Sequence, residues 1–282
     1  MSSTNTVSLT YNLAGEYTIN RLGYGAMQLT GAGVWGEAAD RANALNVLQE
    51  TVKLGVNFID TADSYGPHTN EVLIHDALSD QYDQLVIATK GGLTRTGPNQ
   101  WPVNGDPAYI AQTIEGSLKR LGKKQIQLWQ LHRVDPRFSI EETLAPVAAA
   151  VKAGKIKHVG LSEVGIEEIE RAQKIIPIVS VQNLYNLAQR KWEDVLDYTA
   201  QHNIAFIPWY PLASGPDKLS DKINAIAKAH NATTAQIALA WLLRRSANIL
   251  LIPGTKSITH LKENMAAAGI SLSNEEYEAL SE

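Results

Sequence analysis

The 282-residue chain contains no cysteine, and this absence excludes disulfides, thiolate nucleophiles and cysteine-ligated metal sites. It also lacks an excess of either charge, because 25 Lys and Arg residues are balanced by 29 Asp and Glu residues. A net charge of −4 gives no electrostatic reason to bind nucleic acid or an anionic membrane. The first residues do not show the basic stretch followed by an apolar stretch that is typical of a signal peptide. The longest apolar runs are far too short to span a bilayer. We therefore predict a cytoplasmic protein with no nucleic-acid or membrane partner and no metal site.

Short apolar segments recur along the chain, and each is followed by a segment with helical spacing of apolar residues. The segments are RLGYGAMQL, VNFIDTA, QLVIATKG, IQLWQLH, KHVGLSE, IVSVQNLYN, IAFIPWYPL and NILLIPGT. Their near-continuous hydrophobicity is typical of parallel strands that are covered on both faces. Eight such units without a linker predict an α/β fold, a single (β/α)8 TIM barrel over residues 1–282. A doubly wound open sheet is the alternative. Residues 7–20, with NLAGE as a turn, predict an N-terminal β-hairpin that plugs the bottom of the barrel.

Polar residues stand at the ends of the predicted strands, where the chemistry of a barrel is expected. Asp60 ends the second strand and Tyr65 follows in its loop, while Lys90 and His132 end the third and fourth strands. Each of these residues alone has an ordinary structural explanation, such as a turn cap or a satisfied core histidine. Together they place four groups on one rim of the barrel, and a buried Lys90 needs a partner that Asp60 can supply.

This set of side chains favours proton donation to an oxygen that is gaining negative charge. An unperturbed tyrosine has a pKa of about 10, and a nearby ammonium lowers that pKa by favouring the phenolate. Asp60 would keep Lys90 charged and oriented, and His132 would direct a carbonyl oxygen toward Tyr65. Asp63 receives no chemical role, and we predict that it is a solvated or turn-capping acid.

At this point the sequence resembles the aldo-keto reductase family over nearly its whole length. The matching segments are GYGAMQL, NFIDTADSYG, ATKGG, LWQLHRVDP, HVGLSE, VQNLYN, PWYPLASG and IPGTKSITHLKEN. Within the family it is most similar to the bacterial and yeast-type branch that includes pyridoxal reductases. The resemblance implies a plugged (β/α)8 barrel that reduces aldehydes or ketones with NADPH, as an alcohol dehydrogenase (NADP+)-type or pyridoxine 4-dehydrogenase-type enzyme.

The resemblance also implies a role for each of the four polar residues. The family tetrad falls on Asp60, Tyr65, Lys90 and His132. Tyr65 would be the general acid, Lys90 paired with Asp60 would lower its pKa, and His132 would orient the substrate carbonyl. Hydride would come from the nicotinamide carbon C4.

Cofactor contacts carry over at further positions of this sequence. Trp209 matches the aromatic residue that stacks on the nicotinamide ring, and a neutral aromatic face suits that ring. The carboxamide contacts match Ser162, Glu163 and Gln182, although Glu163 stands where the family usually has Asn. The pyrophosphate segment matches Tyr210, Leu212 and Ser214, and the first-strand loop matches Gly25, Ala26 and Met27, next to Asp60.

The adenine end of the cofactor falls on GTKSITHLKEN, from Gly254 onward. Lys256 would meet the 2′-phosphate at a helix start, whose exposed N–H groups suit a phosphate, and Glu263 and Asn264 would meet the adenine. His260 stands where many members have Arg, which weakens the preference for NADPH and leaves NADH open. No G-x-G-x-x-G motif opens a helix after a strand, so a Rossmann site is not expected.

The substrate side is expected to involve Tyr65, His132 and two tryptophans, Trp35 and Trp101, that could form an apolar wall. We predict a monomer that acts on a small aldehyde or ketone. Two other functions stay open at this point. One is a cofactor-bound regulatory subunit on the same fold, against which His132 argues because those relatives typically carry Asn there. The other is a barrel enzyme that uses Lys90 as a Schiff-base nucleophile.

Overall fold

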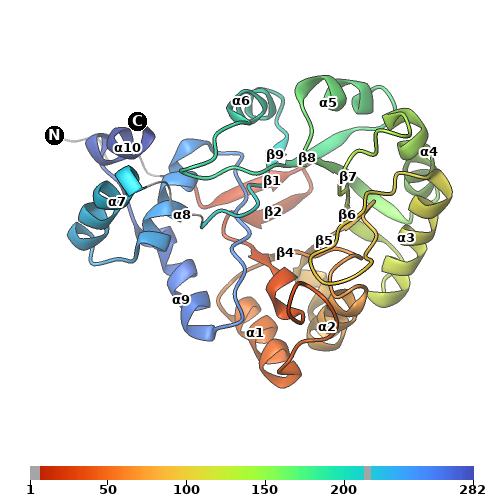
Figure 1. Ribbon diagram of the computed structural model, residues 1–282, viewed down its shortest axis with the longest axis horizontal. Coiled ribbons are helices and arrows are strands. Elements are labelled where there is room, and N and C mark those ends of the chain that lie inside the picture. The colour runs from red at the N-terminus through yellow and green to blue at the C-terminus, as the bar shows by residue number, and fades with distance from the viewer. Residues whose placement is uncertain (1–6, 213–216) are drawn as a thin grey trace.

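The computed structural model describes residues 7–212 and 217–282, and its centre is a parallel sheet that curls on itself (Figure 1). Seven strands follow one another in chain order, and each pairs in parallel with the next. The strands of this sheet are β3 Tyr24–Gly25, β4 Phe58–Asp60, β5 Val86–Gly91, β6 Ile126–Leu131, β7 Ile156–Ser162, β8 Ile178–Gln182 and β9 Ala205–Phe206. Every residue of β4 and β5 is buried, because helices cover the outer face of the sheet and side chains fill its interior.

The expected eighth strand is present as an extended segment and not as a regular strand. Single bridges join this segment to both neighbours, Ile249 to Phe206 on one side and Leu251 to Leu22 on the other. The amide of Leu250 donates to the carbonyl of Phe206 at 2.9 Å, and the amide of Leu251 donates to that of Arg21 at 2.8 Å. Pro253 follows with no N–H group, so the ladder stops there. The fold is the predicted α/β barrel, closed by this segment.

Helices alternate with the strands and lie around the outside of the sheet (Figure 1). The α-helices are α1 Arg41–Lys53, α2 Thr69–Leu78, α3 Pro107–Arg120, α4 Ile140–Lys152, α5 Ile166–Gln173, α6 Glu193–Gln201, α7 Asp217–Ala229, α8 Thr234–Arg245, α9 Ile258–Ala266 and α10 Asn274–Ser281. Short 3-10 helices occupy Ala26–Leu29 (η1), Ser79–Gln84 (η2) and Ala267–Gly269 (η3). Capping boxes begin α4 at Ser139 and α8 at Thr233, which explains the start of these helices from the sequence. Within the described residues, no helix is long and apolar enough to cross a membrane.

A β-hairpin precedes the barrel and closes its lower end. β1 (Thr10–Leu13) and β2 (Tyr17–Asn20) pair antiparallel around a turn at residues 14–16. Leu13 and Ile19 are fully buried, and they pack in one cluster with side chains from the strands and the closing segment. The other members of that cluster are Phe58, Val86, Ala88, Leu128, Ala205, Ile207, Leu250 and Ile252. These residues alternate along their strands, as side chains that point into a barrel must. The hairpin therefore plugs the barrel as the sequence predicts.

Candidate active site

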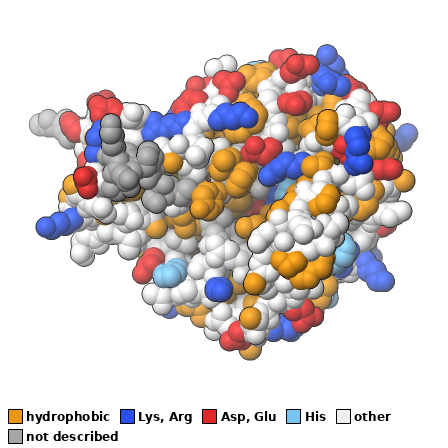
Figure 2. Space-filling view, in the orientation of Figure 1, with side chains coloured by type: hydrophobic (Ala, Val, Ile, Leu, Met, Phe, Trp, Pro, Cys, Tyr) orange, Lys and Arg blue, Asp and Glu red, His pale blue; other side chains and the backbone are white. Residues whose placement is uncertain are grey.

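A cavity of about 570 Å³ opens at the carboxyl ends of the strands. Its lining combines aromatic and aliphatic side chains with a few polar groups, which is the usual character of a small-molecule site. The lining residues are Gly25, Met27, Gln28, Asp60, Tyr65, Leu93, Trp101, Val103, His132, Arg133, Gln182, Trp209, Tyr210, Pro211, Leu212, Ile252 and Gly254. Figure 2 shows hydrophobic side chains gathered near the centre of one face, beside charged side chains of both signs.

Lys90 lies behind the cavity lining and donates to three groups of a buried polar network. Its ammonium group donates to Asp60 Oδ1 at 2.5 Å, to the carbonyl of Thr61 at 2.8 Å and to the Tyr65 hydroxyl at 3.4 Å. The side chain of Lys90 is fully buried, and that of Asp60 is 3% exposed. The three protons of the ammonium are thus all used, and one of them points at the phenol.

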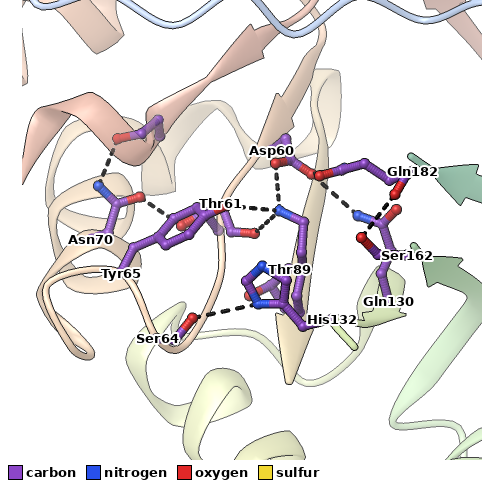
Figure 3. A network of polar contacts seen from close by, with 12 residues as sticks. Asp60, Thr61, Ser64, Tyr65, Asn70, Thr89, Gln130, His132, Ser162 and Gln182 are labelled. Atoms are coloured by element: carbon purple, nitrogen blue, oxygen red, sulfur yellow. Dashed lines mark hydrogen bonds and ion pairs between the residues drawn. The ribbon is translucent and has the colours of Figure 1, made fainter. Parts of the chain in front are cut away.

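Asp60 is held from its other side by two glutamines that point to it from the sheet. Its Oδ2 accepts from Gln182 Nε2 at 2.9 Å and from Gln130 Nε2 at 3.2 Å (Figure 3). Ser180 in turn donates to Gln130 Oε1 at 3.3 Å. A buried carboxylate is stable only when such partners satisfy it, and this one is satisfied on both oxygens. Gln130 was not singled out from the sequence, since a glutamine inside a strand gives no signal of its own.

The charges in this network determine the protonation of Lys90 and Tyr65. Burial lowers the pKa of Lys90, but the opposite effect of Asp60 and Tyr65 is larger. The pKa of Lys90 therefore lies above that of a free lysine. Lys90 is therefore an ammonium at neutral pH, which does not suit a Schiff-base nucleophile. Burial raises the pKa of Tyr65, and this effect exceeds the lowering by Lys90. Tyr65 is accordingly a protonated phenol at neutral pH in this structure.

His132 lies on the other side of Tyr65, at the end of β6. The two rings meet edge to face with centroids 5.9 Å apart, and His132 Nδ1 is 3.4 Å from the Ser64 hydroxyl (Figure 3). Burial and the positive charges of Lys90 and Arg133 lower the pKa of His132 well below its usual value. The imidazole is therefore neutral, with one N–H group that can donate a hydrogen bond.

Arg95 connects the loops around Tyr65 and was not identified from the sequence, where it is one arginine in a Gly- and Pro-rich loop. Its five N–H groups donate to five backbone carbonyls at distances of 2.6–3.2 Å, those of Gly33, Val34, Ser64, Gly97 and Gln100. Its guanidinium also lies 3.6 Å from the ring centroid of Trp101 and 5.6 Å from that of Trp35. Trp101 lines the cavity and meets Tyr65 edge to face at 6.3 Å, whereas Trp35 lies outside the lining.

The residues expected to contact the nicotinamide, the pyrophosphate and the first-strand loop divide into two groups. One group lines the cavity together with Gly254 from the adenine end: Gly25, Met27, Asp60, Gln182, Trp209, Tyr210 and Leu212. Glycine is required at two of these positions because the backbones approach closely. A Cβ atom on Gly25 would lie 2.6 Å from the carbonyl oxygen of Ile252, and a Cβ atom on Gly254 would lie 2.6 Å from the carbonyl oxygen of Gly25. Ala26, Ser162 and Glu163 are outside the lining, and Ser214 lies outside the described residues.

Glu163 contacts the indole N–H of Trp209. Its Oε1 accepts from the indole N–H of Trp209 at 2.7 Å and from the amide of Leu184 at 2.5 Å, and Trp192 Nε1 is 3.4 Å from Oε2. Glu163 and Tyr210 both have left-handed backbone conformations, with φ of 55° and 59°. Such conformations in residues other than glycine cost free energy and concentrate at functional sites. In this structure Glu163 fixes the plane of the Trp209 ring.

The residues expected at the adenine end lie on and before α9, away from the cavity lining. Lys256 and His260 are exposed, Glu263 is half-buried, and Asn264 is buried with no partner for its Nδ2 within the described part of the chain. Ser257 caps the helix by accepting from the amide of His260 at 3.3 Å. Gly254 lines the cavity and lies three residues before the Ser257 cap of α9, so the expected adenine residues adjoin the cavity.

The prediction that Asp63 is a solvated or turn-capping acid is wrong. Asp63 is 0% exposed, and neither carboxylate oxygen has a hydrogen-bond partner among the described residues. Burial raises its pKa well above the usual value, and the charge of Glu71 adds to this effect. Glu71 is also buried but is satisfied by Arg120 and Thr89, both at 2.6 Å. Asp63 is buried because its loop folds back under Tyr65, with the amide of His68 donating to the Asp63 carbonyl at 2.8 Å. No cluster of His, Asp and Glu that could hold a metal ion occurs in the described ranges.

Comparison with known proteins agrees with this fold and site. The sequence pattern of the Aldo/keto reductase family matches residues 21–282. An uncharacterized oxidoreductase of Schizosaccharomyces pombe (strain 972 / ATCC 24843) is 50% identical over 269 residues, which cover 95% of this chain and 88% of that protein. Pyridoxine 4-dehydrogenase of Escherichia coli (strain K12) is 42% identical over 279 residues, which cover 97% of this chain and 96% of that protein.

Solved structures show the same similarity. The thermostable aldo-keto reductase Tm1743, crystallised with the inhibitor epalrestat, superposes with a TM-score of 0.86 at 29% identity, covering 97% of this chain and 99% of that one. An aldo-keto reductase from Klebsiella pneumoniae in complex with NADPH gives a TM-score of 0.82 at 29% identity, covering 97% and 94%. The match over residues 21–282, on a plugged barrel with polar groups at its mouth, shows that this chain belongs to the aldo/keto reductase family.

Proposed function

We propose that this protein is a cytoplasmic, monomeric oxidoreductase that reduces aldehyde or ketone carbonyls to alcohols with NADPH. The observation that carries the proposal is the buried contact between the Lys90 ammonium and the Tyr65 hydroxyl, backed by Asp60 and flanked by His132. Membership of the family and the NADPH complex of the Klebsiella pneumoniae neighbour support the choice of reaction and cofactor.

Tyr65 supplies the proton in this proposal. Its protonated phenol donates to the carbonyl oxygen as hydride reaches the carbonyl carbon, so the product alcohol gains one hydride and one proton. Lys90 stabilises the phenolate that Tyr65 then becomes, because an ammonium beside a phenolate lowers the free energy of the charged form. Neutral His132 donates an N–H hydrogen bond to the same carbonyl oxygen and orients it. When bound, the nicotinamide supplies the hydride.

The residues around the cavity fit a nicotinamide dinucleotide. Trp209, fixed by Glu163, offers a flat aromatic face, and the bare backbone at Gly25 and Gly254 leaves room for close approach. We assign carboxamide contacts to Ser162 and Gln182. The diphosphate contacts are assigned to Tyr210, Leu212 and Ser214, and the adenine contacts to Glu263 and Asn264.

Lys256 is the basis for preferring NADPH over NADH. It is exposed next to the start of α9, where free N–H groups and the helix dipole favour an anion such as a 2′-phosphate. His260, exposed on the first turn, adds a charge only when protonated, so NADH is expected as a weaker alternative. On the substrate side, Trp101 forms the apolar wall of the cavity, and Trp35 supports it through Arg95.

Pyridoxal is the first substrate to test, because a relative 42% identical over nearly the whole chain is a pyridoxine 4-dehydrogenase. A screen of pyridoxal, methylglyoxal and aromatic aldehydes with both cofactors would define the activity. Turnover of any of them separates a reductase from a cofactor-bound regulatory subunit, which would bind NADPH without turnover.

The decisive variant is Tyr65→Phe, which removes the proposed acid and keeps the ring. We expect kcat/KM for aldehyde reduction to fall about 10²–10⁴-fold, the usual contribution of a general acid. The NADPH dissociation constant, measured by quenching of tryptophan fluorescence, should stay within about twofold, since only a hydroxyl is lost. Tyr198→Phe is the matched control, because the Tyr198 hydroxyl is exposed on α6. Normal turnover by Tyr65→Phe would disprove the proposed mechanism.

A further inference from the structure

Arg133 is the charged residue of the cavity that the proposed reaction leaves without a role. It follows His132 directly at the end of β6, is half-buried and lines the cavity. One guanidinium nitrogen donates to the carbonyl of His132 at 2.6 Å and to the Ser162 hydroxyl at 2.9 Å. The group lies 5.7 Å from the ring centroid of Trp209. Arg133 is therefore held between the carbonyl-orienting imidazole and the aromatic face proposed for the nicotinamide.

The rest of the Arg133 guanidinium has no partner within residues 7–212 and 217–282. Its Nε and second terminal nitrogen make no hydrogen bond there, and no carboxylate of the described chain lies within 4.0 Å of it. Five other arginines are paired with acids: Arg41 with Asp76, Arg120 with Glu71, Arg137 with Asp135, Arg171 with Glu141, and Arg245 with Glu193 and Asp197. Arg95, Arg190 and Arg244 have no acidic partner, but each donates from at least two guanidinium nitrogens to carbonyl or amide oxygens, whereas Arg133 donates from one.

Glu163 is the acid that acts on Arg133 most strongly, and it does not satisfy the guanidinium. Its attraction raises the pKa of Arg133, but burial lowers that pKa by more. The carboxylate of Glu163 instead accepts from the indole N–H of Trp209 and from the amide of Leu184. A partly desolvated guanidinium with unused donors is unfavourable, and binding of an anion removes this cost. The planar arrangement of its N–H groups matches a carboxylate or a similar anionic oxygen group.

We propose that Arg133 binds an anionic oxygen substituent of the substrate, so that the preferred substrates are carbonyl compounds carrying a carboxylate or comparable anion near the carbonyl. The inference rests on the proposed carbonyl reduction and narrows its substrate class. Arg133 and His132 are adjacent in the chain and line the same cavity, so the anion lies within a few bonds of the carbonyl that His132 orients. The remaining wall, including Leu93, Trp101 and Val103, contacts the apolar part of the substrate.

The test compares the three formylbenzoate isomers with their neutral methyl esters as substrates of the purified full-length enzyme with NADPH. Each pair differs in charge while keeping the same ring and the same aldehyde. For the wild type we expect at least one isomer with a kcat/KM about 10- to 100-fold above that of its ester, the range given by a hydrogen bond to a charged group. In Arg133→Gln this acid-to-ester ratio should fall by about the same factor.

Two further variants separate the charge at this position from other effects. Arg133→Lys keeps the charge without the fork, so it should retain part of the acid preference, and it serves if Arg133→Gln fails to fold. Arg171→Gln is the matched control, since it removes the same charge from an exposed ion pair with Glu141, and neither residue lines the cavity. Its acid-to-ester ratio should equal that of the wild type.

The outcomes distinguish a substrate anion from a cofactor phosphate and from a structural charge. An unchanged ratio in Arg133→Gln overturns the proposal. Equal losses for acids and esters together with a weaker NADPH dissociation constant also overturn it and assign Arg133 to a cofactor phosphate. Equal losses with normal NADPH binding overturn it in favour of a structural counter-charge to Glu163. Absence of turnover of every ester and every acid by the wild type contradicts the proposed function itself, whereas turnover without acid preference contradicts only this inference.

Discussion

At the scale of the residue, the two aspartates before Tyr65 show how partners decide what a buried carboxylate does. Asp60 has Lys90 on one oxygen and two glutamines on the other, so both oxygens are satisfied and it holds the ammonium beside the phenol. Asp63, three residues later, is equally buried but has no partner on either oxygen within the described chain. An aspartate side chain therefore stabilises the folded protein at position 60 and destabilises it at position 63.

Asp63→Asn should stabilise the protein at neutral pH. The folded pKa of Asp63 is raised above its unfolded value of about 3.9, so between these values the folded state holds one more proton. Its contribution to stability therefore falls as pH rises through that window, and an uncharged Asn avoids the loss. We expect the variant to gain about 1–3 kcal/mol in free energy of unfolding at pH 7, because the linked protonation costs about 1.4 kcal/mol per pH unit above the unfolded pKa and the buried Asn amide offsets part of that gain.

Urea unfolding followed by tryptophan fluorescence measures this effect at pH 4.5 and pH 7. The gain should be smaller at pH 4.5, where the wild-type Asp63 is protonated. Asp80→Asn, on the exposed surface of η2, is the control and should differ little from the wild type at either pH. A loss of stability in Asp63→Asn that is equal at both pH values would contradict the assignment.

At the scale of the element, the long connection between β5 and α3 forms one wall of the site without regular structure. Single bridges pair Leu93 with Val103 and Gly97 with Gln100. Asp135 holds the end of the connection by accepting from the amide of Gly105 at 2.8 Å. Backbone amides add further bonds, from Thr94 to the carbonyl of Pro102 and from Asn104 to that of Gly92. Arg95 joins this connection to the loops before and after β4 through its five carbonyl contacts, so the position of the wall relative to Tyr65 depends in part on this side chain.

Arg95→Lys should reduce turnover although Arg95 lies outside the cavity lining. A lysine has three donors for five carbonyls, so the loops that position Ser64 and Trp101 lose part of their support. A displacement of about 1 Å at Tyr65 or Trp101 can lower the rate by up to about 100-fold, and we expect kcat/KM to fall at least about 10-fold.

The NADPH dissociation constant identifies the loss as one of positioning. It should not change in Arg95→Lys, because Arg95 contacts none of the residues assigned to the cofactor. Thr96→Ala is the control, since the Thr96 hydroxyl contacts only the side chain of Gln100 on the exposed surface. A parallel loss of NADPH binding would mean that Arg95 supports the whole fold and not this wall.

At the scale of the whole molecule, the barrel is closed where its ends meet. The extended segment at residues 248–252 bonds to β9 on one side and to residues 21–23 on the other. The hairpin covers the opposite end with Leu13 and Ile19. Closure removes the open edges that a curled sheet would otherwise expose to solvent.

The sequence predicts the barrel and the convergence of Asp60, Tyr65, Lys90 and His132, because the carboxyl ends of consecutive parallel strands must lie at one rim. It does not predict the burial of Asp63 or the environment of Arg95. These features depend on contacts between loops whose paths are set by the folded chain. Arg95, for instance, donates to Val34 and Gly33, which precede it by 61 and 62 positions in the sequence. No local periodicity of the sequence encodes such a contact. The eighth strand forms only isolated bridges, and the sequence contains a local reason for this, because Pro253 has no N–H group to continue the ladder.

Arg21 offers the test of barrel closure. Its side chain is 1% exposed and donates to the carbonyls of Ile249 and Leu243 at 2.9 Å, to Ser8 at 2.7 Å and to Ser246. Burial lowers its pKa to about 10, so it stays charged at neutral pH. It therefore joins the start of the barrel to the end of α8 and to the closing segment, over more than 200 positions of sequence.

Arg21→Met keeps an unbranched side chain but leaves those carbonyls without a donor, so we expect the free energy of unfolding to fall by about 3–5 kcal/mol. Arg21→Lys, with three donors, should lie between this variant and the wild type. Arg171→Met removes an exposed ion pair with Glu141 and should cost at most about 1 kcal/mol in the same urea titration. If Arg21→Met cost no more than Arg171→Met, closure would rest on the backbone hydrogen bonds of the segment alone. A cost several times larger would mean that one buried guanidinium holds the two ends of the barrel together.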